Sequence, residues 1–504
     1  MRRRQIPSRR ALAALAGSLT LVAAATAWAT TAVKPYIVPI GSSYTVEPLW
    51  SVNDKVPETS NPAKTFRMVG IPDGLGAHKN ANGTTTLYMN HELNQSQLSE
   101  PVIGEPQNRG TFVSKLVLDA HGNPISGERA YDTVFAGNTL VGPAAQTDNT
   151  TPALARFCSG FLAGPANGFD RFIYLTNEET TSPTSFDGRG GLSVAIFDNE
   201  LHTLPKLGHF SKENTVVQPG EGARTVVFSL EDGPESLDSQ LFLYVGRKEH
   251  SHGASVLSRN GLDNGQLYVF RSLDHAKNSE QTFTGGSVTG EWVLVPGADT
   301  MSDVELEAAV DALGAMTFIR IEDGAFSKAN RNVFFFDTTG GNKAQGNELG
   351  RVYSLLLNSE DVLKPATLTV VVNADEVVAH GGDTVLSPDN MDTSGKYLLV
   401  QEDGITQTRA VMAAKGRDGS IWRFDLTAQG ADGSSATRIA QLNPPGRDGV
   451  PVGPGVWESS GIIDASGLFG AGTWLADIQA HPPTAAPAPG TVEDGQLFLL
   501  RGTS

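Results

Sequence analysis

Acidic residues stand at the ends of several short runs of β-forming residues along the chain. These acids are Glu92, Glu178 with Glu179, Glu231 with Asp232, Glu322 with Asp323, Glu402 with Asp403, and Glu458. Carboxylates that lie within a few ångströms of one another repel, and a bound cation relieves this repulsion at neutral pH. Hard oxygen ligands suit Ca²⁺, Mg²⁺ or ferric iron. The acids therefore predict a cation site, provided that the fold brings the strand ends together.

Cys158 is the only cysteine of the chain, so no intramolecular disulfide can form. Two interpretations of this residue stay open. It is either a buried, inert thiol, or a metal ligand or nucleophile. A thiolate is a poor ligand for Ca²⁺, so a place for Cys158 within the acidic cluster implies at least one transition metal.

Arg320 stands two residues before Glu322, within a run of β-formers from Met316 to Ile321 that is predicted to be a strand. Alternation along a strand places both charged side chains on one face. An arginine beside a cation cluster is badly placed unless an anion lies between them, and its planar fork fits a phosphate group. An Arg–Glu ion pair within the core agrees equally well with the spacing.

A glycine opens a run of alternating β-formers six times, at intervals of roughly 70 to 85 residues. The glycines are Gly110, Gly191, Gly265, Gly350, Gly419 and Gly495. A second predicted strand precedes each of these runs, and the connection between them is rich in turn residues. The preceding strands are Thr86–Glu92, Phe172–Glu179, Leu241–Val245, Asn332–Asp337, Tyr397–Asp403 and Thr473–Asp477.

Six hairpins, each with room for about two more strands, predict an all-β protein with the fold of a six-bladed β-propeller. The alternative is a two-sheet sandwich with accidental glycines, which at this length would need two domains. In a propeller, corresponding strand ends from different blades meet at one mouth of the central channel. The acids and Arg320 would meet there.

The N-terminal segment reads as a targeting sequence. Five arginines precede an apolar stretch from Ala11 to Ala25, and small residues follow at Ala27–Ala29. The paired Arg9 and Arg10 favour a twin-arginine signal over an ordinary Sec signal. We therefore expect a signal peptide at 1–29, an N-terminal extension or closing segment at 30–64, and the propeller domain at 65–504. The mature protein would be periplasmic or secreted, with no stable membrane insertion.

The chain is acidic, with a formal net charge of −17. Removal of residues 1–29 leaves 33 basic and 55 acidic residues, a net charge of −22. Such a surface repels nucleic acid and anionic lipid and attracts cations. We expect no nucleic-acid partner, and we expect a monomer.

Several short motifs together resemble the PhoX-type alkaline phosphatases and their relatives. In chain order they are Met89–Leu93, Arg156–Gly160, Asn177–Glu179, Leu207–Glu213, Arg320–Phe326, Pro388–Asn390, Gln401–Gly404, Glu458–Ile462 and Trp474–His481. The resemblance runs from about residue 65 to the C-terminus. It implies an exported six-bladed propeller that holds ferric iron (Fe3+) and calcium (Ca2+) ions at the channel mouth and hydrolyses small phosphate esters.

The resemblance also implies a role for individual residues. Cys158 would bind iron as a thiolate, and Arg320 would hold the phosphoryl oxygens as the catalytic cation. The iron and calcium ligands would be Glu92, one of Glu178 and Glu179, Glu231 and Glu322, with Glu213, Asp389, Glu402 and Glu458 as further calcium candidates. Two alternatives remain open: a calcium-binding propeller without catalysis, and a calcium-dependent esterase or lactonase.

Two basic neighbours of these acids carry separate expectations. His91 precedes Glu92 and points to the opposite face of a regular strand, so a structural role is expected. Lys212 stands where the family usually has histidine, and a lysine near the cations would disturb them. Ile321 replaces the family's usual proline between Arg320 and Glu322, at a position expected to pack away from the metals.

Overall fold

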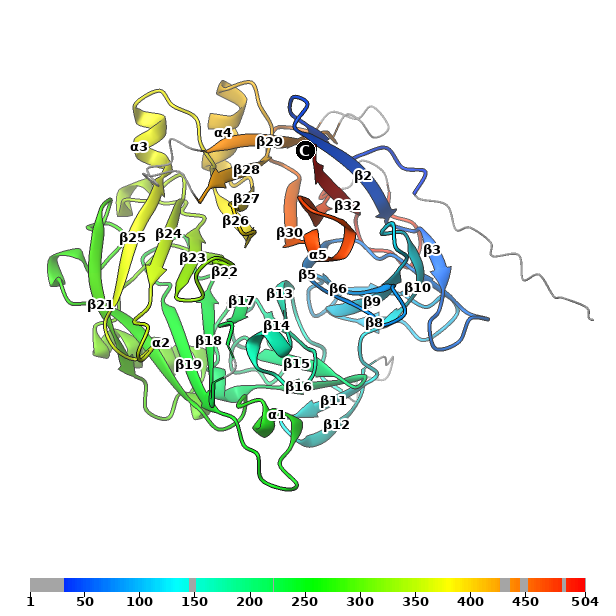
Figure 1. Cartoon of the computed structure of the whole chain (residues 1–504), viewed down its shortest axis with the longest axis horizontal. Helices are drawn as coiled ribbons and strands as arrows, with labels where there is room; N and C mark the ends of the chain where they lie inside the picture. The colour runs from blue at the N-terminus through cyan, green and yellow to red at the C-terminus, as the bar shows by residue number, and fades with distance from the viewer. Residues whose placement is uncertain are drawn as a thin grey trace, which may run out of the picture.

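The computed structural model describes residues 31–144, 151–220, 222–426, 436–444, 452–482 and 486–503. Figure 1 shows antiparallel sheets arranged around a central axis, with β5, β13, β17, β22, β26 and β30 nearest to that axis. Each of these six inner strands begins one blade, and we number the blades in this order. The predicted six-bladed β-propeller is confirmed.

The blades are built from consecutive strands. Blade 1 contains β5 (Pro72–Lys79), β6 (Thr85–His91), β9 (Phe112–Leu118) and β10 (Pro124–Arg129). Blade 2 contains β13 (Phe157–Ala163), β14 (Ile173–Glu178), β15 (Ser193–Phe197) and β16 (Glu200–Thr203), extended by β11 (Thr133–Ala136) and β12 (Thr139–Pro143). Blade 3 contains β17 (Lys212–Val217), β18 (Arg224–Glu231), β19 (Leu241–Arg247), β20 (Gln266–Ser272) and β21 (Ser287–Leu294).

Blade 4 contains β22 (Ile321–Phe326), β23 (Val333–Thr338), β24 (Arg351–Leu356) and β25 (Ala366–Asn373), and β25 also pairs with β21 of blade 3. Blade 5 contains β26 (Pro388–Thr393), β27 (Tyr397–Glu402), β28 (Ser420–Asp425) and β29 (Thr437–Leu442), with β1 (Ile37–Pro39) at its outer edge. Blade 6 contains β30 (Glu458–Asp464), β31 (Thr473–Gln479) and β32 (Gly495–Gly502), with β2 (Tyr44–Ser51) outermost. The N-terminal strands β1 and β2 therefore complete the last two blades.

Short elements connect the blades. The remaining strands are β3 (Lys55–Pro57), β4 (Thr65–Arg67), β7 (Leu98–Ser99) and β8 (Asn108–Arg109). The α-helices are α1 (Val256–Arg259), α2 (Asp303–Leu313), α3 (Ala374–Ala379), α4 (Thr406–Ala414) and α5 (Ser466–Phe469). The helix α2 has a capping box between Ser302 and Glu305 and ends at the left-handed Gly314.

The hydrophobic core is divided among the interfaces between neighbouring blades. Separate clusters of buried side chains fill the contacts between blades 1 and 2, 2 and 3, 3 and 4, 4 and 5, 5 and 6, and 6 and 1. One sheet cannot bury both of its faces alone, so each blade depends on its two neighbours. This closed ring fixes the inner strands around the axis.

Five of the six predicted hairpins are the second and third strands of their blades. In blade 3 the prediction was wrong by one strand, because Leu241–Val245 and Gly265–Phe270 lie in the third and fourth strands, β19 and β20. The third strand of blade 3 is preceded by Gln240 instead of glycine. The glycine of the repeat, Gly265, precedes the fourth strand, β20, so the prediction was shifted to that strand. The predicted strand Met316–Ile321 was also wrong, since residues 316–320 form no strand beyond isolated bridges at Thr317 and Phe318, and β22 begins at Ile321.

Candidate functional site: a carboxylate-lined cavity at one mouth of the channel

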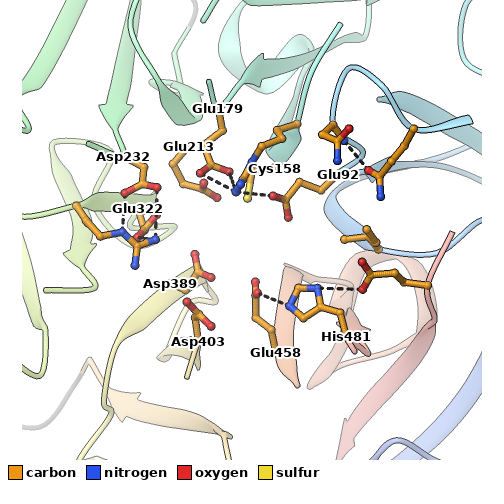
Figure 2. A pocket seen from close by; sticks show the side chains of 16 residues that line it. Glu92, Cys158, Glu179, Glu213, Asp232, Glu322, Asp389, Asp403, Glu458 and His481 are labelled. Atoms are coloured by element: carbon orange, nitrogen blue, oxygen red, sulfur yellow. Dashed lines mark hydrogen bonds and ion pairs between the residues drawn. The ribbon is translucent and has the colours of Figure 1, made fainter. Parts of the chain in front are cut away.

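A cavity of about 250 Å³ opens at one mouth of the central channel (Figure 2). We call it the mouth cavity. It is lined by Ile71, Glu92, Asn94, Gln97, Arg156, Cys158, Glu179, Glu213, Asp232, Arg320, Glu322, Asp389, Asp403, Glu458, His481 and Glu493. These residues come from all six blades or from the loops beside them, as the strand-end argument predicted.

A β-bulge near the start of each inner strand of blades 1 to 5 aims a side chain toward the axis. In blade 2, Phe157 lies opposite Glu178 but Gly160 lies opposite Thr176, so three steps on β13 match two on β14. Blades 1, 3, 4 and 5 have the same shift, beginning at Pro72, Lys212, Ile321 and Pro388. An extra residue of this kind bends a strand and redirects its side chains. The first residues inside the five bulges, directly after the last paired positions, are Asp73, Cys158, Glu213, Glu322 and Asp389.

The second strands supply further carboxylates, at the residue that follows each strand end. Glu92, Glu179, Asp232 and Asp403 occupy this position in blades 1, 2, 3 and 5, and all of them line the mouth cavity. The backbone N–H groups of Glu92, Glu179 and Asp403 donate to the carbonyls of the residues that precede the inner strands of the same blades, over 2.9, 2.9 and 3.0 Å. This contact holds each acid beside the inner strand.

The ligand atoms of these residues form four overlapping groups. The groups are Asp73, Cys158 and Glu213; Glu92, Cys158 and Glu179; Glu213, Glu322 and Asp389; and Asp389, Asp403 and Glu458. Within each group the candidate ligand atoms lie within 4.8 Å of one another. Because neighbouring groups share Cys158, Glu213 or Asp389, the arrangement suits several adjacent cations better than a single ion.

Burial and mutual repulsion raise the pKa values of the central acids. Burial raises the pKa of Glu213 well above its ordinary value, and Glu322, Glu179 and Asp73 raise it further. The pKa of Asp73 is raised to about 7 by burial and by Glu92. Burial raises the pKa of Glu322 to about 8, against the opposing effect of Arg320. Without cations, the folded protein therefore favours protonated acids at this mouth.

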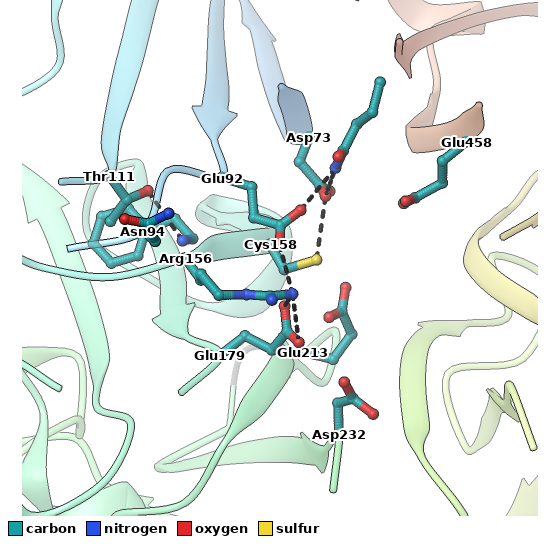
Figure 3. A network of polar contacts seen from close by, with 12 residues as sticks. Asp73, Glu92, Asn94, Thr111, Arg156, Cys158, Glu179, Glu213, Asp232 and Glu458 are labelled. Atoms are coloured by element: carbon teal, nitrogen blue, oxygen red, sulfur yellow. Dashed lines mark hydrogen bonds and ion pairs between the residues drawn. The ribbon is translucent and has the colours of Figure 1, made fainter. Parts of the chain in front are cut away.

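Cys158 lies among these acids and is 6% exposed. Its Sγ atom lies 3.2 Å from Oδ2 of Asp73, as Figure 3 shows. Burial raises the pKa of this thiol, and the negative charges of Asp73 and Glu213 add to the effect. A thiol in this setting becomes a thiolate only when a cation compensates for the charge. The position agrees with a metal ligand and not with an isolated core cysteine.

Hydrogen bonds from neighbouring polar residues orient the carboxylates. The hydroxyl of Ser159 donates to Oε1 of Glu213 at 2.7 Å, and the amide of Asn390 donates to the same hydroxyl at 2.6 Å. The amide of Gln479 donates to Asp73 at 2.7 Å and to Glu92 at 2.9 Å. Such partners fix the direction in which a ligand oxygen points.

Two arginines enter the mouth cavity from opposite sides of blade 3. Arg320 contacts Asp232 through Nε at 2.9 Å and Glu322 through Nη2 at 3.0 Å. Arg156 contacts Glu92 and Glu179, each over 2.7 Å (Figure 3). The Arg–Glu pair that the spacing allowed for Arg320 is thus present, and the same side chain also lines the cavity.

The structure brings most of the predicted site residues together. Glu92, Cys158, Glu179, Glu213, Glu322, Asp389 and Glu458 lie at the mouth cavity with Arg320. Of the pair Glu178 and Glu179, it is Glu179 that faces the cavity. The ligands and catalytic residue that the resemblance implied did not include Asp73, Asp232, Asp403 or Arg156, although Asp232 and Asp403 are among the strand-end acids named from the sequence. Asp232 and Asp403 each follow a chosen glutamate, and the position of Cys158 at the start of an inner strand is the signal that identifies Asp73.

Three predicted ligands, Glu178, Glu231 and Glu402, lie away from the mouth cavity. Each is the last residue of a second strand and points to the side opposite its cavity-facing neighbour. Glu178 accepts the N–H groups of Ala155 and Phe186, and Glu231 accepts that of Gln240. Glu402 accepts two nitrogens of Arg417, at 2.6 and 2.9 Å. These carboxylates hold the backbone and leave no ligand oxygen at the cavity.

The two basic neighbours also point away from the mouth cavity. Lys212 is buried, with its ammonium group donating to the carbonyls of Gly191 and Gly208 at 2.8 Å each. The expectation that it disturbs the cations is therefore wrong, because its side chain turns away from that of Glu213. His91 is buried as well, and its ring contacts Gly70 and Ser114 at 3.1 and 2.7 Å, which confirms its structural role.

Comparison with known proteins gives one family model and several solved structures that resemble this chain. The fold and the site define a six-bladed propeller with an acid-lined, arginine-flanked mouth. The family model described as Alkaline phosphatase PhoX matches residues 198–445. The structure of Pseudomonas fluorescens PhoX in complex with vanadate, a transition-state analogue, matches with a TM-score of 0.64 at 17% identity, over 94% of this chain and 97% of that chain. The search of curated proteins gives no match.

Two further solved structures match with lower similarity. A luciferin-regenerating enzyme matches at 9% identity with a TM-score of 0.34, over 87% of this chain and 94% of that chain. The Pseudomonas aeruginosa periplasmic gluconolactonase PpgL matches at 10% identity with a TM-score of 0.33, over 73% and 85%. The family model and the PhoX structure confirm the predicted resemblance to the PhoX-type alkaline phosphatases, and with it the enzyme class of a phosphoric ester hydrolase.

The predicted signal peptide falls on residues 1–29, which lie outside the described part of the chain. Among the residues that the structure does describe, no helix has the length and apolar character needed to cross a bilayer.

Proposed function

We propose that the protein is an exported, metal-dependent phosphoesterase that uses iron and calcium ions at the mouth cavity. The four overlapping groups of ligand atoms around Cys158, Glu213 and Asp389 carry this proposal. The family match supports phosphate-ester hydrolysis, and the arginine-rich N-terminal segment supports export. In this proposal the catalytic domain is the propeller of residues 65–504, and residues 30–64 complete its ring of blades.

The donor set fits such ions. Cys158 supplies a soft sulfur ligand beside Glu92 and Glu179, which suits ferric iron better than calcium. The group of Asp389, Asp403 and Glu458 offers only oxygens, which suits calcium. Glu213 and Glu322 lie between these regions and would be shared. The raised pKa values of Glu213, Asp389 and Glu458 mark the charge that cations would compensate.

Bound cations would neutralise the negative charge that gathers on the phosphoryl oxygens during hydrolysis. The protein itself would place the ligands and the substrate and would supply positive charge near the phosphoryl group. The bulged inner strands hold the carboxylates in place, and Ser159 and Gln479 orient them. Arg320 presents a guanidinium group to the phosphoryl oxygens, held by Asp232 on one side and Glu322 on the other. No side chain is assigned as a covalent nucleophile.

The proposal is tested by metal analysis together with turnover of an aryl phosphate. We expect the purified wild-type protein to contain iron and calcium in a fixed ratio, and to show a visible thiolate-to-ferric charge-transfer band. The Cys158→Ala variant should lose the iron, the band and the turnover. The Cys158→Ser variant keeps the side-chain size and should lose the band while retaining calcium.

The alternatives give different results. Full activity of Cys158→Ala, with unchanged metal content, would exclude an iron site at the thiol. A colourless protein that binds calcium and turns over no ester would be the calcium-binding propeller without catalysis. Turnover of carboxylic esters or lactones, but not of phosphate esters, would identify the calcium-dependent esterase or lactonase.

A further inference from the structure

Arg156 and Arg320 occupy the same position in two blades. Arg156 directly precedes the inner strand β13 of blade 2, and Arg320 directly precedes the inner strand β22 of blade 4. Both have a left-handed backbone, with φ angles of 47° and 55°. In both blades the carbonyl of the arginine accepts the N–H of the residue after the second strand, Glu179 at 2.9 Å and Thr339 at 3.0 Å. The fold therefore builds one arginine position twice.

The equivalence extends to the ion pairs. Nη2 of Arg156 lies 2.7 Å from Oε1 of Glu92, which follows the second strand of the preceding blade 1. Nε of Arg320 lies 2.9 Å from Oδ1 of Asp232, which follows the second strand of the preceding blade 3. Each arginine is thus tied to an acid of the neighbouring blade, and both side chains line the mouth cavity.

The two guanidinium groups differ in the donors that they leave available. Arg320 points its Nε and Nη2 atoms at Asp232, so one bidentate edge is already occupied. Arg156 makes all of its side-chain contacts through Nη2 alone. Within the described parts of the chain, its Nε and Nη1 atoms have no hydrogen-bond partner, and 46% of its side chain is exposed.

The charges around the mouth cavity indicate what Nε and Nη1 of Arg156 could bind. Glu92, Glu179 and Cys158 surround Arg156 and form one of the groups of candidate metal ligands. A guanidinium group next to metal ions is repelled unless an anion lies between the two positive charges. The left-handed backbone itself belongs to the turn before the inner strand, since Ile71 and Ser387 share it in blades 1 and 5, and the guanidinium group is what distinguishes blades 2 and 4.

We propose that Arg156 is a second phosphate-binding residue, which holds phosphoryl oxygens from the side of the mouth cavity opposite Arg320. Arginine is suited to this role because its planar group donates two parallel hydrogen bonds to a phosphate. This inference rests on the proposed function, because it assumes that the cavity receives a phosphate ester. It assigns the recognition of the phosphate to two blades instead of one.

The test uses inorganic phosphate as the probe and the metal-loaded, full-length protein. For Arg156→Gln we expect unchanged iron and calcium contents, and at least about a tenfold rise in the inhibition constant of phosphate, the size expected for one charge-assisted contact. KM for an aryl phosphate should rise by a similar factor. Arg156→Lys keeps the charge but not the fork, and should recover only part of the affinity. Arg331→Gln, at an exposed site on the opposite end of the channel, is the matched control and should leave phosphate inhibition unchanged.

Several results would overturn the inference. Unchanged phosphate inhibition in an Arg156→Gln variant that keeps its metals would show that Arg156 does not touch the phosphate. Loss of iron or calcium in both variants would make Arg156 a partner of the metal ligands only. If Arg156→Gln does not fold, the Lys variant decides by the same two measurements. A wild-type protein that neither binds phosphate nor hydrolyses aryl phosphates would remove the proposed function as well, whereas active wild type with unaffected variants would remove only this inference.

Discussion

Glu402 and Asp403 are consecutive in the sequence, but their side chains act on opposite sides of the end of β27. Glu402 is fully buried and accepts hydrogen bonds from Arg417, the indole of Trp422 and the N–H of Leu386. Asp403 lines the mouth cavity and belongs to a group of candidate metal ligands. One carboxylate therefore holds the blade together, and the next belongs to the site.

This division predicts different effects of two isosteric substitutions. Glu402→Gln breaks a buried ion pair with Arg417, which typically costs about 3–5 kcal/mol of folding free energy. We expect a clear fall in melting temperature even in a chelator, where cations play no part. Asp403→Asn should keep the melting temperature of the metal-free protein but lower the calcium content and the turnover. The reverse pattern would show that the two roles are exchanged.

The raised pKa values at the mouth cavity predict how the metal-free protein responds to pH. The pKa of Asp73 is raised to about 7 and that of Glu322 to about 8, mainly by burial. Between the ordinary carboxyl range and these values, the folded state binds more protons than the unfolded state. The free energy of unfolding therefore falls as pH rises. The contribution is complete below about pH 4 and is lost as pH rises through 7 to 8.

Thermal unfolding in a chelator should therefore give a lower melting temperature at pH 8 than at pH 5. Added calcium should restore stability, and its effect should grow with pH because binding displaces protons. Asp73→Asn removes one of the titrating groups and should flatten the pH dependence of the metal-free protein. A melting temperature that rises from pH 5 to pH 8 in the chelator would contradict this account.

Glu280 is expected to position Arg320 without touching the substrate. Its buried carboxylate accepts the N–H of Ile319 at 2.8 Å, the hydroxyl of Thr338 at 2.6 Å and that of Tyr353 at 2.7 Å. It thereby holds the loop whose next residue is the left-handed Arg320. Glu280→Gln turns one acceptor into a donor, so we expect unchanged metal content but a rise of several-fold in KM for an aryl phosphate.

Tyr353→Phe is the matched control for Glu280. It removes one hydrogen bond to the same carboxylate but leaves the contact with Ile319, so it should lower stability by about 1 kcal/mol without changing KM. Equal effects of both substitutions on KM would reduce Glu280 to a general packing role.

The regular hairpins of the propeller could be predicted from the sequence, and the inner strands could not. The second and third strands are rich in apolar β-forming residues, as Tyr397–Glu402 is at Tyr397 to Val400, and a glycine begins or shortly precedes five of the six third strands. The inner strands begin with polar pairs such as Glu213–Asn214 and Asp389–Asn390, where the bulge interrupts alternation. A strand prediction that depends on a period of two fails at such a break.

The sequence alone could not show which of two adjacent acids at a strand end faces the mouth cavity. Alternation shows that Glu178 and Glu179 face opposite sides, but a shift of one residue exchanges the two faces. Only the pairing of Glu178 with Phe157 determines that Glu179 faces the mouth. The contribution of Cys158 could be inferred from the resemblance, whereas the role of Arg156 became visible only when two blades were compared.

The glycine before the third strand of blade 2, Gly191, is closely packed against backbone atoms of neighbouring segments. At Gly191 a methyl group would lie 2.0 Å from the carbonyl oxygen of Glu178 and 2.6 Å from that of Phe210, and both contacts are with backbone. Gly191→Ala must therefore displace the end of β14, and we expect a loss of roughly 2 kcal/mol or more of stability together with lower metal content, because Glu179 follows directly. Gly285→Ala has no atom within 4 Å of the added carbon and is the control, with an unchanged melting temperature expected. Equal melting temperatures of the two variants would mean that the glycine at position 191 reflects the turn sequence and not close packing.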